Sequence, residues 1–219
     1  MGRWKVTDGH YSQHNETGKE GILMGLAEDK KQKKRLSLMD AAFGLFTTKG
    51  IARTSIEEIA RAAGIAKGTF YLYFRDKDDL RRILIRHKAA SLLRHALDHS
   101  GYREKEGPAD KILAITDDIL SQLQEDPILL AFFHRNLSWN TFRQAVEELG
   151  DEGRRAIEEV FGPEAGESRD REVESFMILE LIGATCQSVI LDREPVDMET
   201  YRPYLHKAVR SLMESCRAA

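Results

Sequence analysis

The residues best placed to act on another molecule lie close together, between Ile56 and Phe74. Ala60 is small enough for a second helix to cross the first there, and Gly64 tolerates the positive φ that a tight turn requires. Apolar residues able to lock two such helices at a steep angle are Ile59, Ile65 and Phe70. Residues 66–69, which open the second helix, are small or polar, so its backbone could approach the base edges of a DNA major groove. The spacing predicts a helix-turn-helix.

The charges of the chain are distributed unevenly around this motif. Residues 30–88 hold 15 Lys and Arg against 6 Asp and Glu, whereas residues 89–219 hold 15 against 25. A basic module joined to an acidic remainder indicates a polyanion as the partner of the basic part. A chance excess of solvated lysines is the alternative. The run KKQKKR at 30–35 is either such a solvated face or a source of nonspecific attraction to phosphates.

The composition of the whole chain is that of an ordinary globular protein. Of its 219 residues, 42% are hydrophobic and 32% are charged, which allows one sizeable core or two modest ones. The sequence shows no secretory signal and no apolar run of the roughly 20 residues that a membrane span needs. Its two cysteines, Cys186 and Cys216, are too few for a disulfide framework. We therefore expect a cytoplasmic protein with no membrane partner.

Motifs for catalysis or metal binding are missing from the sequence. It contains no G-x-S-x-G elbow, no phosphate-binding loop and no G-x-G-x-x-G after a strand. His95 and His99 are four residues apart and could share a metal ion, but a solvated helix face explains them more simply. The sequence therefore predicts no enzyme, no cofactor and no metal site.

Helical periodicity and helix breakers place nearly the whole chain in helices. Apolar residues at steps of three and four predict a first helix at 31–49, and Ser55 and Glu58 form a capping box that begins the second. Further helices are expected near 66–73, 76–99, 109–125, 127–135, 139–161, 169–192 and 197–217. Gly150 and Gly153 are candidates to interrupt the helix at 139–161. Since no stretch alternates with the period of a strand, we expect an all-α fold.

A longer set of fixed spacings runs through residues 35–80. It comprises Arg35-Leu36, Ala41-Ala42-Phe43, Leu45-Phe46, Gly50, Thr54-Ser55-Ile56, Ile59-Ala60, Ala62, Gly64-Ile65, Lys67-Gly68-Thr69-Phe70-Tyr71, Tyr73-Phe74, Lys77 and Leu80. This set resembles the DNA-binding domain of the TetR family of transcriptional regulators. One departure is Ala66, where the family usually has serine, so a hydroxyl that could cap the recognition helix or contact a phosphate is missing.

The resemblance implies contacts with the DNA backbone at three residues. Thr54 and Ser55 begin the second helix, where hydroxyls and backbone N–H groups can hold a phosphate. Lys77 begins the fourth helix and is implied to clamp a phosphate. Thr54 and Ser55 are helix caps whatever else they do.

Contacts with the groove are implied for the residues around the recognition helix. Lys67, Gly68 and Thr69 open it; Lys67 can reach a base edge or a phosphate, and Gly68 permits close approach. Tyr71 and Tyr73 lie on the groove side and can donate to phosphates or touch thymine methyl groups. A place in the core is the alternative for Tyr71.

The helices expected at 169–192 and 197–217 carry more apolar surface than one buried side needs. The first is apolar around most of its circumference, and the second adds apolar residues at helical spacing. The simplest partner is a second copy of the chain, which would form a two-fold four-helix interface. Gly183 and Ala184 would permit close approach there. The sequence predicts a homodimer.

Aromatic residues are concentrated between Pro127 and Arg143. They suit an apolar pocket but also an ordinary core, and the resemblance implies a pocket for a small-molecule effector without saying which residues line it. The candidate lining residues are Phe132, Phe133, His134, Trp139, Phe142 and Met177.

These observations predict three segments. Residues 1–28 are a disordered or poorly ordered extension, residues 29–77 a three-helix DNA-binding domain with the helix-turn-helix, and residues 78–219 a helical ligand-binding and dimerisation domain. The expected function is that of a repressor released from palindromic double-stranded operator DNA by a small apolar or aromatic ligand. The alternatives are a ligand-blind DNA-binding protein controlled by a protein partner, and a helical adaptor whose helix-turn-helix is vestigial.

Overall fold

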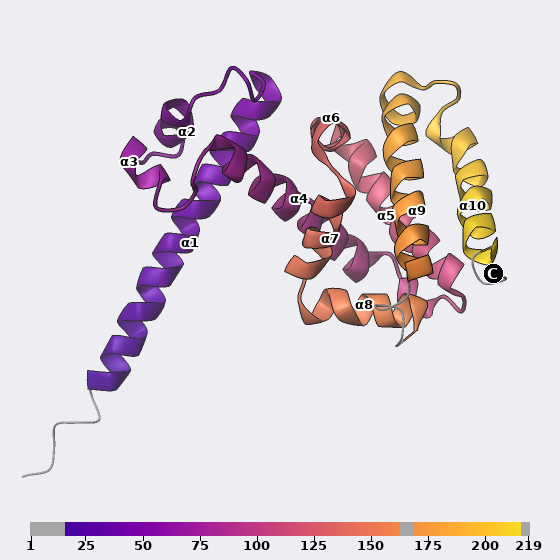
Figure 1. Ribbon diagram of the computed structural model, residues 1–219, viewed down its shortest axis with the longest axis horizontal. Coiled ribbons are helices and arrows are strands. Elements are labelled where there is room, and N and C mark those ends of the chain that lie inside the picture. Colours follow the sequence, from indigo (N-terminus) through magenta and orange to yellow (C-terminus); the bar gives the residue numbers. More distant parts are fainter. Residues whose placement is uncertain (1–15, 163–168, 216–219) are drawn as a thin grey trace, which may run out of the picture. The chain divides into compact units, whose positions relative to one another are not determined.

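The computed structural model describes residues 16–162 and 169–215. Every regular element in these residues is a helix, so the expected all-α fold is confirmed for them (Figure 1). Backbone contacts separate the chain into two compact units, of which the first ends at Lys77 and the second begins at Asp78. Each unit is therefore described by itself.

The N-terminal unit consists of a long helix and a helix-turn-helix. Its helices are α1 (Glu16–Thr48), α2 (Ile56–Ala62) and α3 (Lys67–Phe70). The buried apolar side chains of this unit are Leu38, Met39, Ala42, Phe46, Ile59, Ala60, Phe70 and Phe74. The hydroxyl of Ser37 donates to the carbonyl of Ala63 at 3.2 Å and ties α1 to the end of α2.

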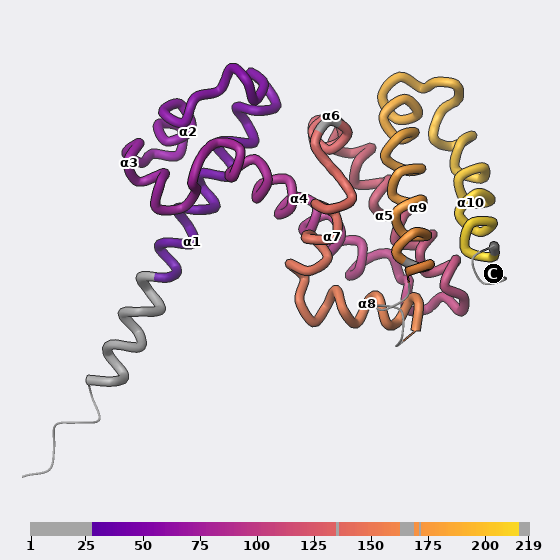
Figure 2. Tube along the Cα trace, viewed as in Figure 1, coloured from indigo at the N-terminus to yellow at the C-terminus, as the bar shows by residue number. Residues whose placement is uncertain are grey.

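The first helix begins earlier than the sequence predicts. Residues 16–28, assigned above to an extension without regular structure, form the first turns of α1, while residues 1–15 lie outside the described residues. Residues 16–28 contain no proline, and lengthening an existing helix costs far less than nucleating one. The later turns of α1, coloured in Figure 2, pack against α2.

The recognition helix is shorter than predicted. The expected range was 66–73, but α3 ends at Phe70. The backbone continues with tighter turns, in which the N–H groups of Leu72 and Tyr73 donate to the carbonyls three residues earlier. Phe70 and Phe74 are both buried, with ring centroids 5.6 Å apart, and hold this segment against the unit.

The second unit is a bundle of helices. Its elements are α4 (Lys77–His99), the 3₁₀ turn η1 (Tyr102–Glu104), α5 (Pro108–Glu125), α6 (Pro127–Asn136), α7 (Trp139–Glu148), α8 (Asp151–Phe161), α9 (Arg169–Gln187), the π-helical turn η3 (Ser188–Asp192) and α10 (Met198–Ser215). Within it, α9 and α10 lie side by side and antiparallel (Figure 1). Pro108 and Pro127 stand at the starts of α5 and α6, where a missing N–H costs nothing.

The helix expected at 139–161 is two helices. Gly150 adopts a φ of 59° and separates α7 from α8. A Cβ at Gly153 would lie 2.5 Å from the carbonyl oxygen of Val146, so only glycine fits where α8 turns back on α7. Both glycines that the sequence marked as candidate interruptions therefore take part in the break.

Candidate nucleic-acid interface and ligand cavity

The turn between α2 and α3 has the geometry that a helix-turn-helix needs. Gly64 has a φ of 70°, in the left-handed region that favours glycine. The N–H of Ile65 donates to the carbonyl of Ala60 at 2.9 Å and closes the turn. Ala60 is almost fully buried, as a small residue between two contacting helices should be.

The residues at the start of α2 are largely engaged within the unit. Thr54 is 2% exposed, and its hydroxyl donates to the carbonyl of Gly50 at 2.8 Å. The Ser55 hydroxyl accepts the N–H of Glu58 at 3.2 Å, while the Ser55 N–H donates to the Glu58 carboxylate at 2.8 Å. This is the predicted capping box. Of the two hydroxyls assigned to a phosphate site, Ser55 is exposed and Thr54 is enclosed.

Two lysines fasten the loop that precedes α2. The ammonium of Lys77 donates to the carbonyls of Ile51 and Thr54, at 2.8 and 2.9 Å. Lys49 forms an ion pair with Glu58, and this bond, followed by those from Ser55, lowers the pKa of the Glu58 carboxyl to about 2. The first role of Lys77 in the structure is thus to hold the start of α2, where the sequence expected a phosphate contact.

The segment from Lys67 to Tyr73 presents the outward face of the helix-turn-helix. Lys67 and Gly68 are exposed, and Thr69 and Tyr73 are half-buried. Tyr71 is 53% exposed and so is not a core residue. The nearest charged partner of Lys67 is the Glu57 carboxylate, 3.9 Å away, and that pair is itself exposed. Sequence reasoning missed Leu72, which is 75% exposed, because an apolar residue between two tyrosines gave no sign of facing outward.

Nothing inside the unit requires a glycine at position 68. Its φ is not positive, and a Cβ there would meet no atom within 4 Å. Alanine would also favour the helix by about 1 kcal/mol. The absence of a side chain at Gly68 leaves the backbone open to close approach by an outside surface. Ala66, the N-cap residue just before α3, leaves that helix without a side-chain cap.

The basic run at 30–35 lies on the surface of α1. Its side chains are exposed, except for Arg35, whose guanidinium lies 6.0 Å from the ring centroid of Phe74. Lys31 forms an exposed ion pair with Glu28 at 3.9 Å. These positions fit both interpretations given above, a solvated face and a source of attraction to phosphates.

The second unit contains a partly open cavity of about 660 Å³ between α4, α5, α7, α8 and α9. The lining residues that carry the argument below are Thr116, Trp139, Phe142, Arg143, Glu172 and Ser175. Most of the remaining wall consists of aliphatic side chains from α5, α8 and α9. A volume of this size is typical of sites for small organic molecules.

The structure divides the sequence-predicted lining residues. Trp139 and Phe142 lie in the cavity wall, with ring centroids 5.9 Å apart. Phe132 and Phe133 are buried but do not line the cavity, and His134 and Met177 are exposed. The wall that sequence reasoning missed is the face of α5 carrying Ile112, Ile115, Thr116 and Ile119, whose helical spacing was a readable signal.

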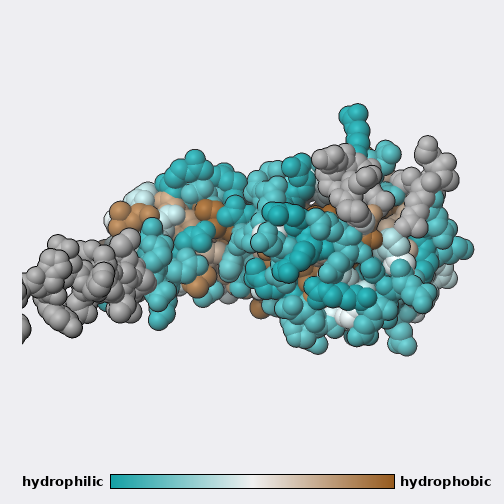
Figure 3. Space-filling model, turned by 90° about the horizontal axis from the view of Figure 1, so that it is seen from below, coloured by the Kyte–Doolittle hydropathy of each residue, from teal (hydrophilic) through white to brown (hydrophobic). Residues whose placement is uncertain are grey.

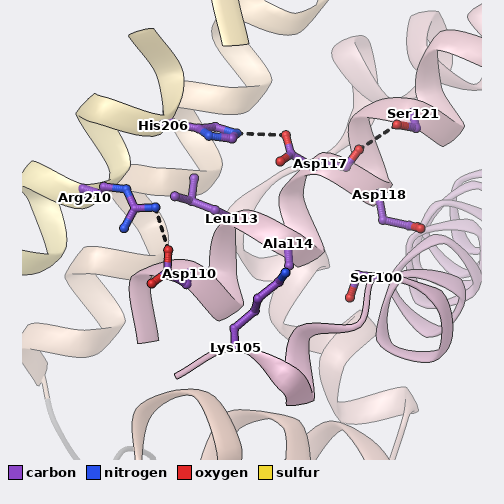
Figure 4. Close-up of a pocket in the computed structure, with 10 residues that line it drawn as sticks. All are labelled: Ser100, Lys105, Asp110, Leu113, Ala114, Asp117, Asp118, Ser121, His206 and Arg210. Atoms are coloured by element: carbon purple, nitrogen blue, oxygen red, sulfur yellow. Dashed lines mark hydrogen bonds and ion pairs between the residues drawn. The ribbon is translucent and has the colours of Figure 1, made fainter. Parts of the chain in front are cut away.

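A second pocket, of about 440 Å³, has polar walls (Figure 4). Arg210 donates to Asp110 at 2.5 Å, and His206 lies 3.0 Å from Asp117. These contacts join α10 to α5. A ligand here would have to displace ion pairs that already satisfy one another, so we assign this pocket to the packing of the unit.

The outer side of α9 carries a row of exposed apolar residues. They are Val173, Phe176 and Met177, and Leu191 in η3 and Tyr204 on α10 are exposed as well. Gly183 and Ala184 are exposed too. On the face seen in Figure 3, by contrast, hydrophilic side chains cover most of the surface and apolar ones form small patches. Exposed apolar side chains along one helix suit an interaction surface.

The same helix is long and apolar enough to cross a membrane by length and composition. The stretch that passes this test is Glu172–Asp192. It carries acidic residues along its length, Glu172, Glu174 and Glu180, and it contacts α6 and α10 within the bundle. One helix of this kind is weak evidence for a membrane span.

Comparison with known proteins finds a family match that covers the helix-turn-helix and the residues on either side of it. Residues 38–82 match the family described as bacterial regulatory proteins, tetR family. The HTH-type transcriptional regulator AcrR of Shigella flexneri is 45% identical over 49 residues, which are 22% of this chain and 23% of the relative. The match to the curated relative thus spans less than a quarter of its length.

Solved structures resemble the chain over a larger part. FadR of Bacillus subtilis, in complex with stearoyl-CoA, has a TM-score of 0.58 at 20% identity, covering 80% of this chain and 96% of its own. A TetR transcriptional regulator of Rhodococcus sp. RHA1 has a TM-score of 0.58 at 20% identity, covering 83% and 96%. At these identities the likeness shows a shared fold.

Proposed function

We propose that this chain, whose N-terminal unit is a DNA-binding domain of the TetR family, is a cytoplasmic transcriptional repressor that a small apolar ligand releases from its operator. The observation that carries the proposal is the pairing of an outward-facing helix-turn-helix with an apolar cavity of about 660 Å³ in a separate unit. A DNA-binding protein without an effector needs no such cavity.

The DNA contacts are proposed for the face that the structure leaves open. Lys67, Gly68, Thr69, Tyr71 and Tyr73 form one short segment, and its exposed side chains and bare glycine suit the major groove. Ser55 and the N–H groups at the start of α2 are the backbone-contacting part. Thr54 and Lys77 act through the loop that they hold, because their polar atoms are bonded inside the unit.

We propose that the operator is an inverted repeat read by a homodimer. The apolar row on α9 and the exposed Tyr204 of α10 form the interface, with Gly183 and Ala184 at the point of closest approach. A two-fold dimer presents two recognition helices to half-sites about one helical turn apart, roughly 34–36 Å, or a small multiple of it.

The ligand is proposed to be largely apolar. Most of the cavity wall is aliphatic and aromatic. Its charged residues are Arg143, Glu147, Arg169 and Glu172, of which Arg143 and Glu172 pair with each other at 3.1 Å. The similar FadR structure was solved with stearoyl-CoA, which supports a ligand with an extended apolar part.

Coupling between ligand and DNA is proposed to pass along α4. This helix begins at Lys77, which holds the loop before α2, and sixteen residues later it lines the cavity with Leu93 and Leu97. A ligand that favours a different position of this helix would weaken both half-sites of a dimer together. A coupling of about 1–3 kcal/mol would give 5- to 150-fold relief.

The test begins with selection of an operator from random duplexes, followed by titration with decanol, 1-naphthol and stearoyl-CoA. At least one compound should raise the melting temperature and release the selected duplex at the same concentrations. Ala156→Phe, which fills part of the cavity, should leave operator affinity unchanged and abolish that release; Ser121→Phe, outside the cavity, is the matched control. If every stabilising compound leaves operator affinity unchanged, a DNA-binding protein controlled by a protein partner becomes the better description.

A further inference from the structure

The ligand cavity contains a hydroxyl group that the protein does not use. Thr116 lies on α5, is 4% exposed and lines the cavity. Its Oγ1 has no hydrogen-bond partner among the described residues, and the atom keeps some accessible surface. The hydroxyl therefore opens onto the cavity space rather than onto another part of the wall.

Two other hydroxyls on the helices of this unit are satisfied by their own backbone. Ser121, on the same helix, donates to the carbonyl of Asp117 at 2.9 Å. Thr185, on α9, donates to the carbonyl of Leu181 at 2.7 Å and accepts the Tyr201 hydroxyl at 2.9 Å. Back-bonding to the carbonyl four residues earlier is the usual solution for a hydroxyl in a helix. Thr116 is an exception, and it is the one of the three that faces the cavity.

An unsatisfied hydroxyl in an apolar wall is unfavourable unless something in the cavity completes it. Its neighbours on the same helix face are Ile112, Ile115 and Ile119, none of which can donate or accept. A charged ligand group beside these residues would lose its hydration without a counter-ion. A neutral hydroxyl or carbonyl group on the ligand avoids both costs. It completes the hydrogen bonding of the threonine hydroxyl, and it carries no charge that must lose its hydration.

We propose that Thr116 selects the effector by hydrogen-bonding a neutral hydroxyl or carbonyl oxygen on an otherwise apolar molecule. The inference rests on the proposed function, since it concerns the same cavity, and it narrows the effector class from any hydrocarbon-like ligand to alcohols, phenols, ketones and esters. Ser175, also in the wall and without a partner among the described residues, is only half-buried and can be satisfied by water.

Two probes of nearly equal shape test the proposal, 1-naphthol and 1-methylnaphthalene, which differ by a hydroxyl in place of a methyl group. Their dissociation constants are measured by calorimetry for the native chain and for three variants. Thr116→Val is isosteric and removes the hydroxyl, whereas Thr116→Ser keeps it. Ile119→Val removes one methyl group from the same helix face. The compared quantity is the affinity for naphthol divided by that for methylnaphthalene, which cancels changes in cavity shape.

The affinity for naphthol divided by that for methylnaphthalene should fall about 3- to 10-fold in Thr116→Val, which is the range expected for one hydrogen bond. This ratio should be retained in Thr116→Ser. In Ile119→Val both probes should weaken alike. A ratio that is the same in the native chain and in Thr116→Val overturns the role of Thr116 while leaving the cavity as an apolar ligand site. If neither probe binds the native chain, the ligand part of the proposed function fails as well.

Discussion

The two units of this protein use their polar side chains in opposite ways. In the N-terminal unit, Thr54, Glu58 and Lys77 are bonded to the loop before α2, and the surface that we propose for DNA is a short segment with an exposed glycine. In the second unit, the Thr116 hydroxyl stays unbonded inside a cavity. Internal hydrogen bonds thus fix the loop before α2 in the first unit, whereas the second unit contains a cavity with an unbonded hydroxyl in its wall.

This difference fits the two ligands that we propose, operator DNA for the first unit and a small apolar molecule for the second. DNA has a fixed groove geometry, so a reading element gains from being held rigidly before binding. A cavity in an unliganded core forgoes contacts between its walls, and a ligand that fills it restores them. We therefore expect substitutions in the first unit to change operator affinity or local stability directly, and those in the second to act through assembly or the effector.

The largest effect is expected from Gly183→Arg. No atom lies within 4 Å of a Cβ at Gly183, and the residue is exposed, so arginine fits the isolated chain. In the proposed dimer it would place a charge in the apolar contact. Sedimentation should show monomers, and operator affinity should fall by about 100-fold or more, since one half-site remains. Gly183→Ala should stay dimeric. A native chain that sediments as a monomer at micromolar concentration would refute the interface.

A pair of glycine substitutions comes next. Gly68→Ala and Gly44→Ala both add a methyl group at an exposed helical position with no atom within 4 Å. Each should raise the stability of the unit by up to about 1 kcal/mol. Only Gly68→Ala should weaken operator binding, by about 1–3 kcal/mol, because only that backbone approaches the bases. Thermal melts and operator titrations of the two variants separate the effects, and equal operator affinities would mean that the reading face is misassigned.

Lys77→Ala tests whether the loop before α2 is held from inside. Loss of the two bonds to the Ile51 and Thr54 carbonyls should lower the free energy of unfolding by about 1–2 kcal/mol, as seen in urea melts. Operator affinity should fall alike for all sequences. If Lys77 instead contacts a phosphate, the stability should be unchanged, and the slope of operator affinity against salt concentration should fall by the contribution of about one phosphate contact. Lys77→Arg, which keeps the charge but changes the donor geometry, is the control.

The smallest effect concerns pH. The hydrogen bonds from Lys49 and Ser55 lower the pKa of Glu58 from 4.5 to about 2. A lowered folded-state pKa adds stability that is complete above pH 4.5 and is lost as the pH falls toward 2. In Glu58→Gln this part of the acid dependence should be missing, so the melting temperatures of variant and native chain should converge as the pH approaches 2. Parallel curves across this range would show that the pair contributes nothing.

Much of the DNA-binding unit follows from the sequence because its signals are local. The capping box at Ser55, the turn at Gly64 and the apolar spacing from Ile59 to Phe70 each act over a few residues, and the structure contains all three. The length of α3 was overestimated, because burial of Phe70 and Phe74 shapes the backbone after Phe70 and propensity alone does not show it.

The sequence by itself determined that the described part of this chain is helical and where most of its helices break. Only the tertiary structure decided which aromatic residues line the cavity. Phe132 and Trp139 are both aromatic residues on helices, so the sequence does not distinguish them, but only Trp139 lies in the cavity wall. It also decided that Thr54 and Lys77 are bonded inward and that the Thr116 hydroxyl is free. The reason is physical: caps and turns form between neighbours in sequence, whereas the environment of a side chain depends on helices that pack from far along the chain.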